Sequence, residues 1–81
     1  SQLKLFMYTL YDIDINQSGT IHSFSNSYDS ISRLSELGII SGAVFRVVQK
    51  TPFGGPIQIK LNSFYIAIRK EDAQMINVKY K

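Results

Sequence analysis

Residues 51–56, TPFGGP, form the segment whose residue types could do chemistry most directly. A glycine-rich loop cradles phosphate when it follows a strand, opens a helix and carries a lysine and a hydroxyl at fixed spacing. Here strand-like segments lie on both sides and no Gly-Lys-Ser/Thr follows, so the segment does not match a nucleotide-binding loop. The pattern instead predicts a hairpin turn in which Gly54 and Gly55 supply positive φ and Pro52 and Pro56 stiffen the two ends.

Phe53 stands at the tip of this predicted hairpin. Two arrangements are open to it. The ring either folds down over the adjoining strands or stands out as an apolar contact for a partner, since loop residues carry function disproportionately.

Metal and catalytic chemistry have little support elsewhere in the chain. His22 is the only histidine and there is no cysteine, so His22 has no second soft metal ligand. Asp12 and Asp14 alternate along a segment expected to be extended and could face the same way, but two carboxylates alone make a poor cation site. No serine lies in a nucleophile motif. We therefore expect no enzyme activity, no cofactor and no metal site.

The 81 residues allow one small domain, which we take as residues 1–81, with residues 1–7 as a possible extra or disordered N-terminal segment. Residues 1–41 carry two basic and four acidic side chains (−2), whereas residues 42–81 carry seven and two (+5). The excess of basic residues in the second half of the chain favours a strand face exposed to solvent. The alternatives are a surface that binds an acidic partner or a membrane. No apolar run approaches the roughly 20 residues that span a bilayer.

Most of the chain has the period-two alternation of half-buried antiparallel strands. The clearest example is IQIKL, where Ile57, Ile59 and Leu61 share one face. The segments expected to form strands are residues 20–24, 43–50, 57–61, 64–69 and 76–80. So many short strands in so short a chain predict a mainly β, closed or half-closed small barrel, because closure removes exposed edges. Residues 70–74 can form a single helical turn.

One short α-helix is predicted over residues 29–38. Asp29 or Ser30 can cap its start. Gly38 is expected to end it in the left-handed conformation, which would let Ile39 pack back on Leu34. The helix has an apolar stripe formed by Ile31, Leu34 and Leu37.

Residues 33–78 closely resemble the FeoA family, small cytosolic proteins of bacterial ferrous iron transport. The resemblance rests on an ordered set of family positions: Arg33, Leu34, Leu37, Gly38, Gly42, Pro52, Gly54, Gly55, Pro56, Ile68, Arg69, Ala73, Ile76 and Val78. The opening TLYDIDINQSGTI also looks like the start of the family pattern, with a small insertion at residues 16–19.

The resemblance implies an SH3-like barrel of five or six short strands with one short α-helix, and a cytoplasmic protein without enzymatic activity. It also implies a partner, the cytosolic G-protein region of the FeoB membrane transporter, whose transport activity it would modulate. No nucleic acid and no direct membrane insertion are expected. The alternative is a stand-alone regulatory or nucleic-acid-binding barrel related to the C-terminal domain of metal-dependent repressors.

A barrel leaves its loops and its helix free for docking. The candidate partner-binding residues are therefore Arg33, Leu37, Gly38, Pro52, Phe53, Gly54, Gly55, Pro56 and Arg69. The two arginines could each form a bidentate contact with an acidic group of the partner. They could instead brace the barrel internally against Glu36 or Asp72, which is the arrangement we favour. The apolar stripe likewise favours a core role over an interface role for Leu34 and Leu37.

Overall fold

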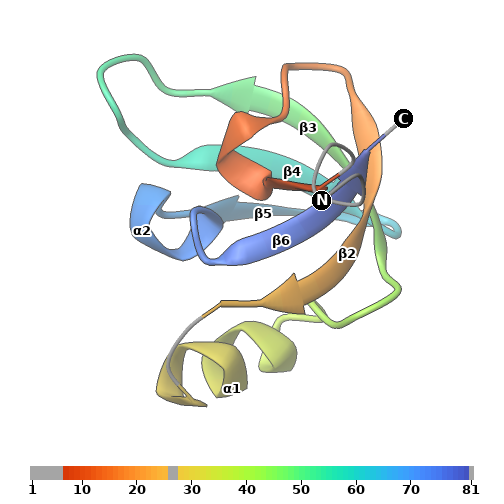
Figure 1. The fold of residues 1–81 in the computed structure, drawn as a ribbon. Coiled ribbons are helices and arrows are strands. Elements are labelled where there is room, and N and C mark those ends of the chain that lie inside the picture. The colour runs from red at the N-terminus through yellow and green to blue at the C-terminus, as the bar shows by residue number, and fades with distance from the viewer. Residues whose placement is uncertain (1–6, 26–27, 81) are drawn as a thin grey trace.

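The computed structural model describes residues 7–25 and 28–80, which form one antiparallel sheet with two short helices (Figure 1). The strands are β1 (Met7–Thr9), β2 (Ser18–Phe24), β3 (Val44–Lys50), β4 (Ile57–Leu61), β5 (Phe64–Ile68) and β6 (Ile76–Tyr80). The helices are α1 (Tyr28–Glu36) and α2 (Lys70–Ala73), and a 3₁₀ turn, η2 (Leu10–Asp12), follows β1. The strand order is β1-β6-β2-β3-β4-β5. The predicted fold class, mainly β with short strands, is confirmed.

Two irregularities help the sheet to curve into a barrel. The pairing register shifts between Ile21 and Ser23 where β2 meets β6, and between Val47 and Gln49 where β3 meets β4. An extra residue on one strand of a pair bends that strand and increases its local twist. The curved sheet brings its two edges toward each other. As a result η2, which follows the edge strand β1, contacts α2, which follows the other edge strand β5.

The alternation predicted for β4 is confirmed, because Ile57, Ile59 and Leu61 are each almost fully buried. β5 follows the same alternation less completely. Ile68, opposite Ile57, is buried, but Phe64, opposite the buried Leu61, is 45% exposed. Phe64 follows the two-residue turn between β4 and β5, where Asn62 adopts a φ of 59°, and it lies at an end of an edge strand. Within the described residues, no strand pairs with β5 beyond this edge.

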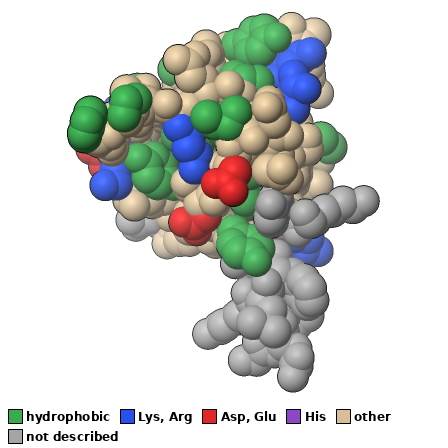
Figure 2. All heavy atoms as spheres, turned by 90° about the horizontal axis from the view of Figure 1, so that it is seen from above, with side chains coloured by type: hydrophobic (Ala, Val, Ile, Leu, Met, Phe, Trp, Pro, Cys, Tyr) green, Lys and Arg blue, Asp and Glu red, His purple; other side chains and the backbone are tan. Residues whose placement is uncertain are grey.

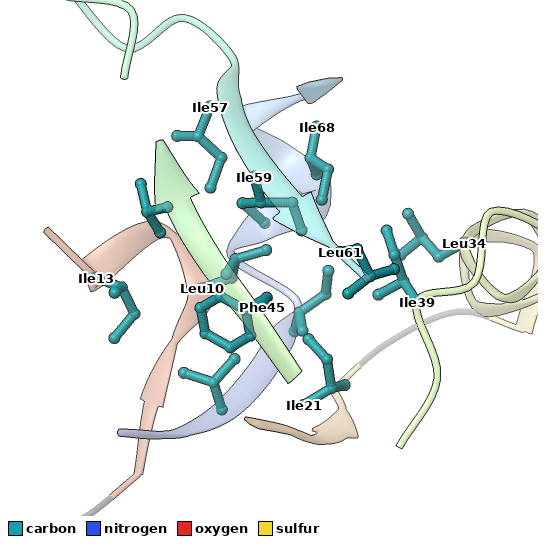
Figure 3. Close-up of a cluster of buried hydrophobic side chains, with 14 residues drawn as sticks. Leu10, Ile13, Ile21, Leu34, Ile39, Phe45, Ile57, Ile59, Leu61 and Ile68 are labelled. Atoms are coloured by element: carbon teal, nitrogen blue, oxygen red, sulfur yellow. The ribbon is translucent and has the colours of Figure 1, made fainter. Parts of the chain in front are cut away.

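The core is a single cluster of aliphatic side chains around the ring of Phe45 (Figure 3). It draws residues from η2, from the strands, from α1 and from α2, so the burial of each element depends on the others. Its buried members are Leu10, Ile13, Ile21, Leu34, Ile39, Phe45, Val47, Ile57, Ile59, Leu61, Ile68, Ala73, Ile76 and Val78.

The end of α1 is as predicted. Gly38 has a φ of 93°, and Ile39 N–H donates to Leu34 O at 3.1 Å while Gly38 N–H donates to Ser35 O at 3.0 Å. These two bonds satisfy helix carbonyls that have no intrahelical donor. Ile39 and Leu34 are both buried and lie beside Leu61 in Figure 3. The start of the helix differs, because α1 begins at Tyr28 and so includes Asp29 and Ser30 in its first turn instead of beginning after them.

The N-terminal region departs from the prediction. Residues 1–6 lie outside the described part of the chain, but Met7, expected in an extra segment, begins strand β1. Asp12 lies in η2, not in an extended segment with Asp14, and its Oδ2 accepts hydrogen bonds from Thr9 N–H at 3.1 Å and Thr9 Oγ1 at 3.0 Å. Hydrogen bonds between Thr9 and Asp12 stabilise this 3₁₀ turn. The alternation of polar and apolar residues, which predicts strands, gives no sign of it.

β2 is also longer than predicted, because it begins at Ser18 and includes Gly19. A Cβ on Gly19 would lie 2.5 Å from Lys79 O and 2.9 Å from the Phe45 ring. Gly19 therefore belongs to a strand where two backbones and a core ring approach closely, and it is not part of a turn.

Candidate partner-binding site

The hairpin predicted at residues 51–56 connects β3 to β4 and extends away from the body of the molecule (Figure 1). Thr51 N–H donates to Pro56 O at 3.1 Å and closes the loop. Phe53 and Gly54 have φ values of 65° and 77°. The prediction of positive φ is thus confirmed at Gly54 and wrong at Gly55, where a Cβ would lie 2.6 Å from Thr51 Cγ2. Gly55 is required for this close approach, and the second left-handed residue is Phe53.

Phe53 is displayed and not folded down, because the residue is 103% exposed. A bulky residue in the left-handed region is a conformational outlier, since its Cβ approaches the following carbonyl oxygen. Pro52, Gly54 and Pro56 are exposed as well. The loop therefore places a large apolar ring entirely in solvent, on a backbone conformation that a residue with a Cβ disfavours. Such strain, where it is observed, is a reason to look for function.

Three side chains from separate elements meet near the base of this hairpin. Lys50 Nζ, at the end of β3, and Lys70 Nζ, at the start of α2, each lie 5.7 Å from the centroid of the Tyr11 ring in η2. Lys50 Nζ also donates to Tyr11 O at 3.1 Å. The sequence reasoning did not identify this group, because its members are far apart in the chain and no spacing connects them.

Arg33 and Arg69 converge on one acidic group. Arg33 Nη2 lies 3.0 Å from Asp72 Oδ1, and Arg69 Nε lies 3.3 Å from Asp72 Oδ2. Asp72 is only 5% exposed, whereas the arginine side chains keep 49% and 66% of their surface in solvent. Internal bracing is therefore what the two arginines do in this structure, and Glu36, the other acidic residue considered, is exposed. Their outer surfaces remain accessible.

The end of α1 presents an apolar surface. Leu34 is buried as expected, but Leu37 is 45% exposed, so its assignment to the core was wrong. Gly38 and Ile39 turn the chain away immediately after Leu37, and the side chain is left at the rim. Ile40 is 52% exposed, and a Cβ on Gly38 would lie 3.8 Å from the Phe64 ring. Exposed apolar groups thus surround the helix end.

The candidate residues therefore fall into two groups. Figure 1 shows α1 at one end of the view and the β3–β4 hairpin tip toward the other, with α2 on the same side as the tip. α2 is linked to both groups. Asp72 holds Arg33 of α1, and Lys70 Nζ lies 3.5 Å from the position that a Cβ on Gly54 would take.

The described residues show no cluster suited to metal ligation. No group of three or more His, Cys, Asp or Glu side chains gathers within residues 7–25 and 28–80, and His22 is exposed on β2. Neither helix in that part of the chain combines the length and the hydropathy needed to span a bilayer.

Solved structures with the same fold connect this geometry to known proteins. A crystal structure of an iron uptake regulatory protein, FeoA, superposes with a TM-score of 0.85 at 23% identity, over 93% of this chain and 99% of that one. The FeoA of Stenotrophomonas maltophilia, solved with zinc and described as an SH3 domain protein, gives 0.76 at 28% identity over 89% of each chain. A manganese-dependent transcriptional repressor gives 0.86 at 20% identity, and this chain spans only 37% of its length.

These likenesses support an SH3-like barrel, which occurs both as a separate protein and as part of longer metal-dependent repressors. Of the two FeoA proteins, one is described as an iron uptake regulatory protein and the other as a possible activating factor of bacterial ferrous iron transport. The model of the FeoA domain matches residues 8–80, nearly the whole sequence, and this protein therefore belongs to the FeoA family.

Proposed function

We propose that this protein is a non-enzymatic, cytoplasmic accessory protein of bacterial ferrous iron uptake. In this role it binds the cytosolic G-domain of a FeoB-type transporter and modulates transport, with residues 1–81 acting as one FeoA-like domain. Membership of the FeoA family supports the link to iron transport. The docking surface is supported by the structure of the β3–β4 hairpin and of the α1 end.

The observation that carries this proposal is Phe53. Its ring is fully exposed, and its backbone adopts a φ of 65° that favours glycine or asparagine instead. Neither feature stabilises the barrel, because the ring makes no core contact there. A buried aromatic anchor is a common energetic centre of protein interfaces, and Phe53 is available for that role.

Leu37 and the two arginines offer the second contact. Leu37 is half exposed beside Gly38, and Arg33 and Arg69 keep outer surfaces free while Asp72 fixes their positions. An arginine already held in place loses less side-chain entropy when it forms a further contact. We therefore expect the helix end to contribute to the same complex.

The test is a binding measurement between this protein and the purified, folded cytosolic G-domain of the cognate transporter. Wild type should bind, Phe53→Ala should bind at least about tenfold more weakly, and both should have the same melting temperature. Tyr65→Ala is the matched control, since Tyr65 is an exposed aromatic on β5 away from the tip. If the wild-type protein does not bind the G-domain, the proposal is refuted. If Phe53→Ala and Tyr65→Ala lose the same affinity, Phe53 has no specific role in the contact.

Nucleic-acid binding by a repressor-like barrel is the competing function, and the fold likeness to the manganese-dependent repressor favours considering it. Phosphate-driven binding weakens steeply as salt rises, because condensed counterions are released from the nucleic acid. A salt series with double-stranded DNA therefore separates the two functions. Tight binding to DNA at low salt, with a steep loss of affinity at higher salt, would favour nucleic-acid binding over transporter binding.

A further inference from the structure

We propose that Lys50, Lys70 and Tyr11 form a recognition site for a carboxylate-bearing segment of a protein partner, which contacts Phe53 at the same time. The site deepens the function proposed above and rests on it. It specifies the surface that the partner must present, namely an apolar pocket with acidic residues at its rim.

The geometry of the site comes from three elements that the barrel brings together. Both ammonium nitrogens lie 5.7 Å from the same Tyr11 ring centroid, so they are no farther apart than twice that distance. The hydrogen bond from Lys50 Nζ to Tyr11 O at 3.1 Å fixes one of them further. Attraction to the ring quadrupole favours these positions of the two flexible lysine side chains before any ligand arrives.

The charge of this group is not neutralised within the described part of the chain. Asp72 lies close in sequence to Lys70, but its carboxylate is engaged by Arg33 and Arg69. Neither Lys50 nor Lys70 forms an ion pair with a carboxylate of residues 7–25 and 28–80. Carboxylates of an acidic segment can therefore approach the two ammonium groups without displacing a carboxylate of the protein itself.

The site is continuous with the displayed tip. Thr51 follows Lys50 directly, and Lys70 Nζ lies 3.5 Å from where a Cβ on Gly54 would stand. A free ion would contact the lysines and leave the fully exposed Phe53 in water. A macromolecule can contact both, with its carboxylates at the lysines and an apolar pocket around the ring.

The surrounding charges favour a discrete acidic segment over an anionic membrane. Asp12 and Glu71 are exposed and directly follow Tyr11 and Lys70 in the sequence. The face shown in Figure 2 mixes basic, acidic and apolar side chains and has no uniform basic surface. An anionic bilayer would act on all of these charges together and repel the acidic ones. A protein segment can place its carboxylates at the lysines alone.

The first experiment needs no transporter. Amide resonances of the full chain are followed by NMR during titration with a tetraglutamate peptide, and with tetraglutamine as the neutral control. We expect shifts centred on Tyr11, Lys50, Gly54 and Lys70 with tetraglutamate only, and their loss in a Lys50→Gln/Lys70→Gln double variant. Lys60→Gln should keep them, because Lys60 lies 6.0 Å from the Tyr65 ring centroid in a similar pair on other strands.

Several results would overturn the site. These are no localised shifts with tetraglutamate, equal shifts with tetraglutamine, or persistence of the shifts in the double variant. Equal or tighter binding of inorganic phosphate would show a general anion site, and stronger binding to vesicles containing phosphatidylserine would show a membrane contact. Either outcome would also contradict the assignment to an acidic protein segment.

The second experiment measures affinity for the transporter's cytosolic G-domain. Lys50→Gln/Lys70→Gln should weaken binding about tenfold and flatten its salt dependence, while Lys60→Gln should behave as wild type. Wild-type binding that is unchanged in the double variant would refute the site but leave the proposed function standing. No wild-type binding, together with a positive tetraglutamate titration, would refute the proposed function and leave the carboxylate-recognition site standing.

Discussion

Arg33 and Asp72, 39 residues apart in the sequence, form a charge-assisted pair in which Arg33 Nη2 donates to both carboxylate oxygens at 3.0 Å. The pair ties α1 to α2, and Arg69 adds a second donor to the same carboxylate. Because Asp72 is buried and both arginines are partly exposed, the carboxylate is the member whose loss most affects the fold.

Asp72→Asn should lower the free energy of unfolding by about 1–2 kcal/mol, because the asparagine amide is neutral and can accept at only one of the two oxygen positions that three arginine hydrogen bonds now use. The value is kept low since solvent screens the exposed arginines. Urea unfolding measures it. Glu71→Gln, at the exposed neighbouring position, is the control and should change stability by less than about 0.5 kcal/mol. Equal effects of the two substitutions would contradict a structural role for the pair.

Leu34→Ala should cost about 2–5 kcal/mol, because it opens a cavity in the core at a residue that is 2% exposed. Leu37→Ala, one helical turn later, should cost less than about 1 kcal/mol, since Leu37 lies at the rim. Thermal unfolding of the two variants compares them directly. Similar losses would mean that Leu37 is a core residue after all.

Gly19→Ala should destabilise the protein by about 2–3 kcal/mol, because the added Cβ meets a backbone oxygen of β6 that cannot move independently. Gly42→Ala provides the contrast. Gly42 has a φ of 93° with nothing within 4 Å of the added Cβ, so only the backbone conformation is penalised, by about 1 kcal/mol. A smaller loss at Gly19 than at Gly42 would refute the close approach of β2 and β6.

Phe53→Asn should raise the melting temperature, because asparagine adopts the left-handed conformation more readily than phenylalanine and no packing is lost. The same change at Tyr65, in the extended strand β5, should lower it, since asparagine is disfavoured in strands. Calorimetry of both variants measures whether each melting temperature rises or falls relative to wild type. A lower melting temperature for Phe53→Asn would indicate that the ring stabilises the folded protein.

The hydrophobic pattern and the glycine positions determine much of this molecule locally. Period-two alternation predicted β4 and β6, and Gly38 predicted both the end of α1 and the return of Ile39 onto Leu34. These features depend on neighbours within a few residues, where backbone geometry alone decides which side chains share a face. The family resemblance likewise rests on ordered positions along the chain.

Only the tertiary structure decided which side chains meet across the chain and which remain in solvent. Asp72 reads in sequence as an acid in the first turn of a short helix, but folding buries it between Arg33 and Arg69. Lys50 and Lys70 share the Tyr11 ring only because the curved sheet brings η2 to α2. Leu37 and Phe53 are exposed because no other element among residues 7–25 and 28–80 covers the helix end or the hairpin tip. Whether a side chain is buried depends on how all the elements pack together, so the alternation of residues within one segment cannot predict it.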